Sequence, residues 1–210
     1  MTFSLSAFLG EIVAPSRCAA CDEKTKLDAF LLFCGGCGAS IEPSTSGEGA
    51  FVYGGAIADA IVKLKYAGRS ELASRLGRAM SERAPRDVDL VVPVPLHPLR
   101  AAERGFNQSA LLARPIARAF GVRLEARALE RIRDTPRQAA LDRTDRLVNV
   151  RAAFRCRAPR VVTGRRILLV DDVRTTGATI AECRAVLASA GARSVRTFVL
   201  AVRDELPEFR

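Results

Sequence analysis

The sequence predicts an α/β protein, in which a parallel sheet flanked by helices follows a small cysteine-rich N-terminal module. Three observations support this. From residue 50 onward, short apolar runs alternate with segments of helical periodicity, as in strands joined by crossover helices. Four of the six cysteines lie in the first 40 residues. The stretch IEPSTSGEGA between the two parts is rich in proline, serine and glycine, which is typical of a linker. We therefore expect two regions, 1–48 and 49–210.

The N-terminal region contains two C-x2-C pairs, CAAC and CGGC, separated by 12 residues. Each pair can place two thiolates on one metal ion, and the spacing is slightly tighter than is usual for four-cysteine zinc sites. Zinc would supply the folding free energy of a module that is too small for its own core. Two disulfides or a redox dithiol are the alternatives. The expected ligands of a structural zinc ion are Cys18, Cys21, Cys34 and Cys37.

The first residues of the chain place apolar side chains at helical spacing, which predicts a short amphipathic helix docked on the body of the protein. Glu11 interrupts this apolar run and no basic segment precedes it. Neither a secretory signal nor a membrane-spanning helix fits such a segment, so we expect a cytoplasmic protein. A role at a membrane surface is the alternative for this helix.

The formal net charge is +10, and arginine supplies nearly all of the positive charge. A strongly basic chain favours anionic partners without identifying the anion. An arginine bias of this kind also arises from a GC-rich genome.

The region after residue 50 contains recognisable strands and helices. The segment 56–68 places Ile57, Ile61, Val62 and Leu64 on one helical face. The strand at 89–96 ends in two prolines, so its last residues have to leave the sheet. The other expected strands lie at 50–55, 127–132, 166–170 and 192–202, and the other helices at 70–83, 108–120 and 180–191.

The most informative stretch is ILLVDDVRTTGAT, residues 167–179, in which a buried strand runs into two acids and a threonine-glycine turn. Ligands of open parallel sheets bind beyond the carboxyl ends of the strands. Backbone N–H groups, threonine hydroxyls and the positive end of a helix dipole together form a site for a monophosphate. Gly177 would let the backbone approach that phosphate closely.

Two carboxylates beside a phosphate repel it and need another partner. The vicinal hydroxyls of a ribose can donate hydrogen bonds to Asp171 and Asp172, and a shared Mg²⁺ would offset the charge. The stretch therefore predicts a ribose 5-phosphate site. An acidic strand end followed by a threonine-rich N-cap is the alternative.

The same stretch resembles the phosphoribosyl-diphosphate fingerprint of type I phosphoribosyltransferases. Together with VVPVPLHPLRAAERGFNQSALLA, TPRQAALDRTDRLVNVRAAF and the double C-x2-C motif, the chain resembles the ComF family, the competence-protein-F-like proteins of bacterial DNA uptake. The resemblance covers nearly the whole chain and implies a type I phosphoribosyltransferase-like sheet. It implies that Asp171 and Asp172 hold the ribose, and that the 5-phosphate lies on Arg174, Thr175, Thr176, Gly177, Ala178 and Thr179.

The Mg²⁺-bound diphosphate of such a ligand would lie on the loop after VVPVPL. Guanidinium groups match phosphate oxygens well. His97 is either a spacer in the loop or a residue that contacts the diphosphate. The expected residues are Leu96, His97, Pro98, Arg100 and Arg104. We also expect Asn107 and Gln108 to face the same mouth. From its pattern alone, the segment 131–154 is either a solvated helix or a mobile lid over the site. By the same resemblance, it corresponds to the flexible loop that closes over the site.

These observations lead to three functional hypotheses. The first is a ComF-like accessory protein of DNA uptake that binds phosphoribosyl diphosphate with Mg²⁺ and handles single-stranded DNA, with a DNA-uptake helicase or other competence proteins as partners. The second is a cytoplasmic phosphoribosyltransferase with an unidentified small acceptor, and the third is a sensor of the sugar phosphate. Because the chain has no tryptophan and two tyrosines, we expect strand binding to be weak and to rely on phosphate contacts rather than base stacking. The basic residues expected to contribute are Arg17, Lys24, Lys26, Arg131, Arg133, Arg137, Arg143 and Arg146.

Overall fold

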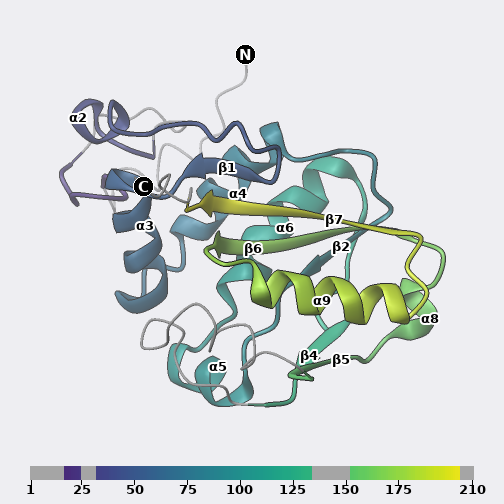
Figure 1. Ribbon diagram of the computed structural model, residues 1–210. Helices are drawn as coiled ribbons and strands as arrows, with labels where there is room; N and C mark the ends of the chain where they lie inside the picture. Colours follow the sequence, from purple (N-terminus) through teal and green to yellow (C-terminus); the bar gives the residue numbers. More distant parts are fainter. Residues whose placement is uncertain (1–16, 25–31, 134–151, 204–210) are drawn as a thin grey trace, which may run out of the picture.

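The computed structural model describes residues 17–24, 32–133 and 152–203 (Figure 1). Its centre is a five-stranded sheet of order β1-β7-β6-β2-β3, in which all neighbouring strands are parallel. The predicted α/β architecture is therefore confirmed. The strands are β1 (Gly49–Val52), β2 (Leu90–Pro93), β3 (Arg123–Leu124), β6 (Arg166–Arg174) and β7 (Ser194–Val202).

Both faces of the sheet are covered (Figure 1). One face carries α3 (Gly55–Tyr66), α4 (Leu72–Arg83) and α6 (Gln108–Phe120). The other carries α8 (Pro159–Val162), α9 (Ala178–Ser189) and an antiparallel pair formed by β4 (Leu129–Arg131) and β5 (Phe154–Cys156). Two short helices, α2 (Gly35–Gly38) and α5 (Pro98–Arg104), lie outside these layers.

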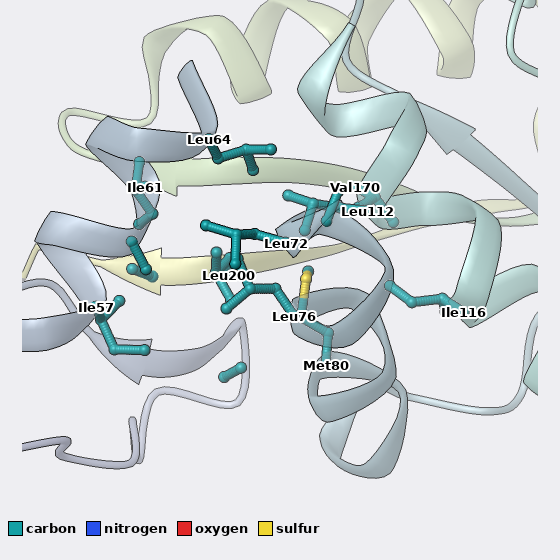
Figure 2. Packing of buried hydrophobic residues seen from close by; sticks show 14 of the residues in the cluster. Ile57, Ile61, Leu64, Leu72, Leu76, Met80, Leu112, Ile116, Val170 and Leu200 are labelled. Carbon is teal, nitrogen blue, oxygen red and sulfur yellow. The ribbon is translucent and has the colours of Figure 1, made fainter. Parts of the chain in front are cut away.

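Alternate residues of β6 supply the two cores. Leu168 and Val170 belong to the cluster that includes α4 and α6, whereas Ile167 and Leu169 belong to the cluster that includes α9. This follows from the two-residue period of a strand, which sends successive side chains to opposite faces. Figure 2 shows the first cluster, where side chains from α3, α4 and α6 meet those of the sheet.

The predicted apolar face of α3 is correct except at one residue. Ile57, Ile61 and Leu64 are buried, but Val62 is 49% exposed. Val62 follows Ile61 directly and is therefore about 100° away from it around the helix. The buried face instead continues with Lys65, which is four residues after Ile61 and largely buried.

The strand β6 is longer than its apolar run. It continues through Asp171 and Asp172 to Arg174 because β7 remains paired with it as far as Val202. On its other side, β2 ends at Pro93 opposite Val170, and the N–H of Val94 makes the last bond to that strand. Proline has no N–H to donate, so the two prolines end β2 early. The acid pair therefore lies in the sheet with one flank uncovered.

The cysteine region packs against the body of the protein. Cys18, Ala19 and Phe33 are buried in the same cluster as residues of α3 and α4. The division at residue 48 remains a prediction, although β1 begins at Gly49.

The predicted N-terminal helix and most of the segment 131–154 lie outside the described residues. The two described ends of that segment are paired, since Arg131 of β4 lies opposite Phe154 of β5. In the part of the chain that the structure describes, no helix has both the length and the apolar composition needed to span a membrane.

Candidate functional site

A cavity of about 540 Å³ lies where β2 ends beside β6. Its wall includes the end of β6, the turn into α9, the segment after β2 and the ends of α3 and α5. Six basic and three acidic side chains line it, so the cavity has a net positive character that favours an anionic ligand. These side chains are Lys65, Arg100, Arg104, Arg131, Arg174, Arg203, Glu103, Asp171 and Asp172.

The acid pair forms the floor of this cavity. Asp171 and Asp172 are 9% and 4% exposed. Oδ1 of Asp171 accepts hydrogen bonds from Ser109 Oγ at 2.7 Å and from the N–H of Asp172 at 2.9 Å. Burial, followed by repulsion from Asp172, raises the pKa of Asp171 to about 7. The two carboxylates therefore repel each other when both are charged, and the pair is suited to bind a cation or hydroxyl donors.

Lys65 reaches the acid pair from the last turn of α3, and sequence reasoning missed it. Its ammonium forms an ion pair with Asp172. Burial disfavours the charged lysine, but attraction to Asp172 and then to Asp171 outweighs burial and raises the pKa of Lys65. A usable signal was present in the sequence, because Lys65 continues the buried face of Ile57, Ile61 and Leu64, where a lysine requires an acidic partner.

The turn between β6 and α9 presents polar groups to the cavity. Gly177 adopts φ +74° as the N-cap of α9, a conformation that favours glycine. Thr176 Oγ1 is buried and has no hydrogen-bond partner among the described residues. A buried hydroxyl without a partner is costly and marks a position where a ligand atom would be satisfied. All six residues of the predicted phosphate site, Arg174 through Thr179, line the cavity.

The predicted diphosphate segment is only partly in the cavity. Leu96, Arg100 and Arg104 line it, whereas His97 and Pro98 do not. Both of the latter begin α5, with His97 at the N-cap and Pro98 at the first helical position.

The expectation that Asn107 faces the mouth was wrong. Its Nδ2 donates to the carbonyl of Val94 at 3.0 Å, and its Oδ1 accepts from the N–H of Ser109 at 3.0 Å. Asn107 thereby caps α6. Gln108, which does line the cavity, accepts a hydrogen bond from Arg104 at 2.5 Å.

Two aromatic side chains also line the cavity. The guanidinium carbon of Arg104 lies 5.3 Å from the ring centre of Tyr66, and that of Arg203 lies 5.2 Å from the ring centre of Tyr53. Tyr66 is 68% exposed. The two tyrosines of the chain therefore both lie at this site, which the sequence alone did not suggest.

Arg131 was expected among the basic residues that rim the mouth of the site and contact a nucleic acid strand, and the structure places it in the cavity wall. It is 6% exposed, and its guanidinium lies over the ring of Phe154 at 5.5 Å. The structure describes three of the other basic residues in that expectation, namely Arg17, Lys24 and Arg133. The rest lie outside the described residues: Lys26, Arg137, Arg143 and Arg146.

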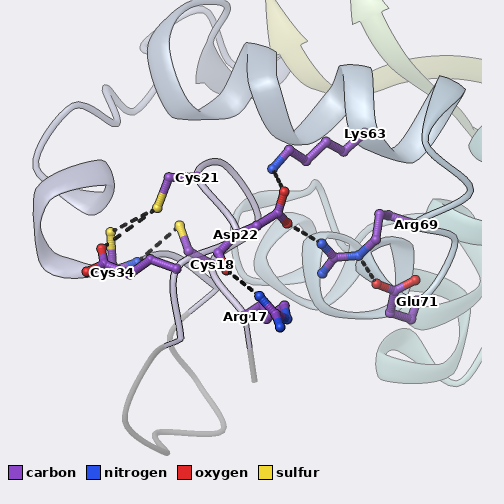
Figure 3. A network of polar contacts seen from close by, with 9 residues as sticks. Arg17, Cys18, Cys21, Asp22, Cys34, Lys63, Arg69 and Glu71 are labelled. Atoms are coloured by element: carbon purple, nitrogen blue, oxygen red, sulfur yellow. Dashed lines mark hydrogen bonds and ion pairs between the residues drawn. The ribbon is translucent and has the colours of Figure 1, made fainter. Parts of the chain in front are cut away.

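The four predicted zinc ligands converge on one point, and Figure 3 shows three of them, Cys18, Cys21 and Cys34. Their sulfur atoms lie within 4.8 Å of one another, and those of Cys21 and Cys34 are 3.7 Å apart. A tetrahedral zinc site with Zn–S bonds of about 2.3 Å requires sulfur separations of roughly 3.8 Å. The arrangement therefore fits a single four-thiolate ion better than two separate sulfur pairs.

Neighbouring groups shift the pKa values of two of the thiols in opposite directions. Burial opposes ionisation of Cys18, but N–H groups of Cys21, Cys34 and Ala20 lower its pKa to about 6. Hydrogen bonds with Cys34 and then Cys21 raise the pKa of Cys37 to about 12. Four thiolates this close repel one another, and a divalent ion would relieve that repulsion. None of the neighbouring glycines Gly35, Gly36 and Gly38 has a positive φ, because they form α2.

Comparison with known proteins identifies the larger region. A model of the phosphoribosyl transferase domain matches residues 107–209. The chain is 34% identical over 203 residues to the DNA utilization protein YhgH of Escherichia coli K12, a match that covers 87% of this chain and 88% of the relative. The protein of the same name in E. coli O6:H1 is 38% identical over 148 residues, covering 67% and 64%.

A third relative is the competence protein F of Haemophilus influenzae. It is 32% identical over 114 residues, which cover 54% of this chain and 50% of the relative. The chain thus belongs to the ComF/YhgH family of proteins with a phosphoribosyltransferase domain.

Proposed function

We propose that the cavity binds 5-phosphoribosyl diphosphate together with Mg²⁺, and that the protein acts in the handling of DNA taken up by the cell. One observation carries the ligand proposal: the acid pair and the threonine-glycine turn share one basic cavity. The DNA role is supported by similarity to proteins named for DNA utilization and competence.

The ligand can be laid out along the cavity from its chemistry. The 5-phosphate is assigned to the turn Arg174–Thr179, where N–H groups at the start of α9 and the Thr176 hydroxyl can donate. The ribose hydroxyls are assigned to Asp171 and Asp172. The diphosphate is assigned to Arg100 and Arg104, with no contact from His97 or Pro98. The acid pair would also hold Mg²⁺, which offsets the charge between carboxylates and phosphates.

Thr176→Val tests the phosphate assignment without disturbing the fold. The hydroxyl has no partner among the described residues, so its loss should leave thermal stability nearly unchanged. Binding of phosphoribosyl diphosphate in calorimetry should weaken by about tenfold or more, the usual worth of a hydrogen bond to a charged group.

Thr163→Val is the matched control. Thr163 Oγ1 donates to the carbonyls of Pro159 and Ala190, so this variant should lose stability and keep its affinity. Equal affinity of wild type and Thr176→Val would remove the 5-phosphate from this turn.

A contribution of base stacking to DNA binding follows from the two tyrosine–arginine pairs. An aromatic ring beside a guanidinium is the usual platform for bases of single strands. Tyr66 and Arg104 supply such a pair at the exposed end of the cavity. This differs from the expectation that phosphate contacts dominate, which had rested on the absence of tryptophan and the scarcity of tyrosine.

The tyrosines themselves report on this proposal. The chain has no tryptophan and two tyrosines, and both line the cavity. An oligothymidylate should therefore quench the intrinsic fluorescence, whereas an abasic strand of equal length should bind without quenching. Quenching should be largely lost in Tyr66→Leu. If the two strands bind equally well and neither quenches, binding rests on phosphate contacts alone.

A phosphoribosyltransferase that acts on a small acceptor is the second candidate. It is favoured by the match of residues 107–209 to the phosphoribosyl transferase domain. Release of diphosphate on addition of candidate acceptors would support it. Tight binding without release would support a sensor of the sugar phosphate.

A further inference from the structure

Lys65 occupies the position where a cation would be expected at the acid pair. Its ammonium contacts Oδ2 of Asp172, and the two side chains are 20% and 6% exposed. Burial of paired carboxylates without a compensating charge would be costly. Lys65 is therefore the internal counter-charge of the site, supplied by a helix remote in sequence from β6.

A divalent ion that binds the acid pair has to compete with this ammonium. Lys65 neutralises one unit of negative charge and covers one oxygen of Asp172. Oδ1 of Asp171 is already an acceptor for Ser109 Oγ and for the N–H of Asp172. Since Mg²⁺ needs several accessible oxygen ligands, the pair is a poor site for a divalent ion alone.

An anionic ligand changes this balance, because Lys65 also lines the cavity and can pair with a phosphate instead. We infer that Lys65 is an exchangeable counter-ion, which holds Asp172 in the empty cavity and transfers to the anionic ligand when a divalent ion takes its place. The identity of that ligand rests on the proposed function, whereas the competition in the empty cavity rests on the geometry alone. Metal and sugar phosphate should consequently strengthen each other's binding.

Lys63 offers a matched control on the same helix. It is also 20% exposed and also forms an ion pair, but with Asp22 of the cysteine region. The substitution Lys63→Met removes the same charge from the same kind of side chain, two positions away from Lys65. Any difference between Lys65→Met and Lys63→Met therefore reports on the acid pair rather than on charge in general.

The experiment titrates Mn²⁺ alone into zinc-loaded full-length protein and follows free Mn²⁺ by electron paramagnetic resonance. Lys65→Met should bind Mn²⁺ about tenfold or more tightly than wild type, because a like charge beside the metal has been removed. Lys63→Met and Lys65→Arg should match wild type. If Lys65→Met does not fold, Lys65→Gln carries the same test, since its amide can still donate to Asp172. An affinity for Mn²⁺ unchanged in both neutral variants would overturn the inference.

A second titration separates this inference from the proposed function. Ribose 5-phosphate should increase the affinity of wild type for Mn²⁺ and should increase that of Lys65→Met much less. If ribose 5-phosphate binds neither protein while the Mn²⁺ difference persists, the proposed ligand is wrong and the competition by Lys65 stands. If the sugar phosphate binds but Mn²⁺ affinity is equal in all variants, the inference about Lys65 falls alone.

Discussion

The cysteine region and the sheet are stabilised in different ways. The helix α2 of the cysteine region has no buried residue, and its surroundings are organised around four converging sulfur atoms. The sheet region distributes its stability over two apolar cores, one on each face. In α4, Gly77 packs so closely on α6 that an added Cβ would lie 2.6 Å from the carbonyl oxygen of Leu112. We therefore expect the cysteine region to depend chiefly on its four-sulfur site and the sheet region on close packing, so equivalent substitutions should have different consequences.

Removal of a metal ligand should have the largest effect and should stay local. Cys18→Ser replaces a buried ligand whose loss leaves three thiolates, and structural zinc supplies on the order of 10 kcal/mol of binding free energy in small modules. We expect zinc content well below one equivalent and loss of amide protection around residues 17–24 and 32–40, while β6 and β7 remain protected. Hydrogen exchange with elemental analysis measures both. Zinc at one equivalent in Cys18→Ser would contradict the four-thiolate site, and Cys156→Ser, outside the cluster, is the control.

The glycines of the two regions provide the next comparison. Gly77→Ala forces a shift of backbone or of Pro115, whose Cγ would lie 2.9 Å from the new atom, and overpacking of this kind costs about 1–3 kcal/mol. Gly36→Ala meets no atom within 4 Å and should be neutral or stabilising by up to about 1 kcal/mol. Urea unfolding of zinc-loaded proteins compares them. If the two variants have equal free energies of unfolding, α4 and α6 can separate slightly without cost.

Some residues of the site could be predicted from local sequence patterns, whereas others could not. The strand-turn-helix stretch and the cysteine spacing are local patterns, and the residues of each come together in the structure. Lys65 and Ser109 were not recognised as site residues because they reach the cavity from other elements, and only the strand order brings those elements to one edge. The early end of β2 at Pro93 could be predicted. Its consequence, an uncovered flank beside Asp171, required the register with β6.

The acid pair gives the sheet region a dependence on pH. The pKa of Asp171 is raised to about 7 in the folded protein from 3.8, so the folded state binds more protons than the unfolded state between these values. Stability therefore falls as pH rises through this window, with a slope of at most about 1.4 kcal/mol per pH unit. Asp171→Asn should abolish this fall in urea unfolding of zinc-loaded protein between about pH 5.5 and 7.5. The exposed Asp59→Asn should keep it, and a slope unchanged in Asp171→Asn would mean that another group titrates.

The smallest effect is expected at the ion pairs that connect the two regions. Asp22 follows Cys21 and pairs with Lys63 and Arg69 of the sheet region (Figure 3). Its side chain is 44% exposed, so these contacts are screened by water and salt. Asp22 also has φ +61°, which asparagine adopts readily, so Asp22→Asn removes the charge and keeps the backbone.

For Asp22→Asn we expect full zinc content, with a slight loss of amide protection at residues 17–24 that disappears at high salt. Hydrogen exchange at two salt concentrations measures this, and Asp59→Asn again serves as the control. A large loss of amide protection at residues 17–24, or a loss that high salt does not remove, would contradict this expectation. The cysteine region would then depend on its contacts with the sheet region and not chiefly on its metal.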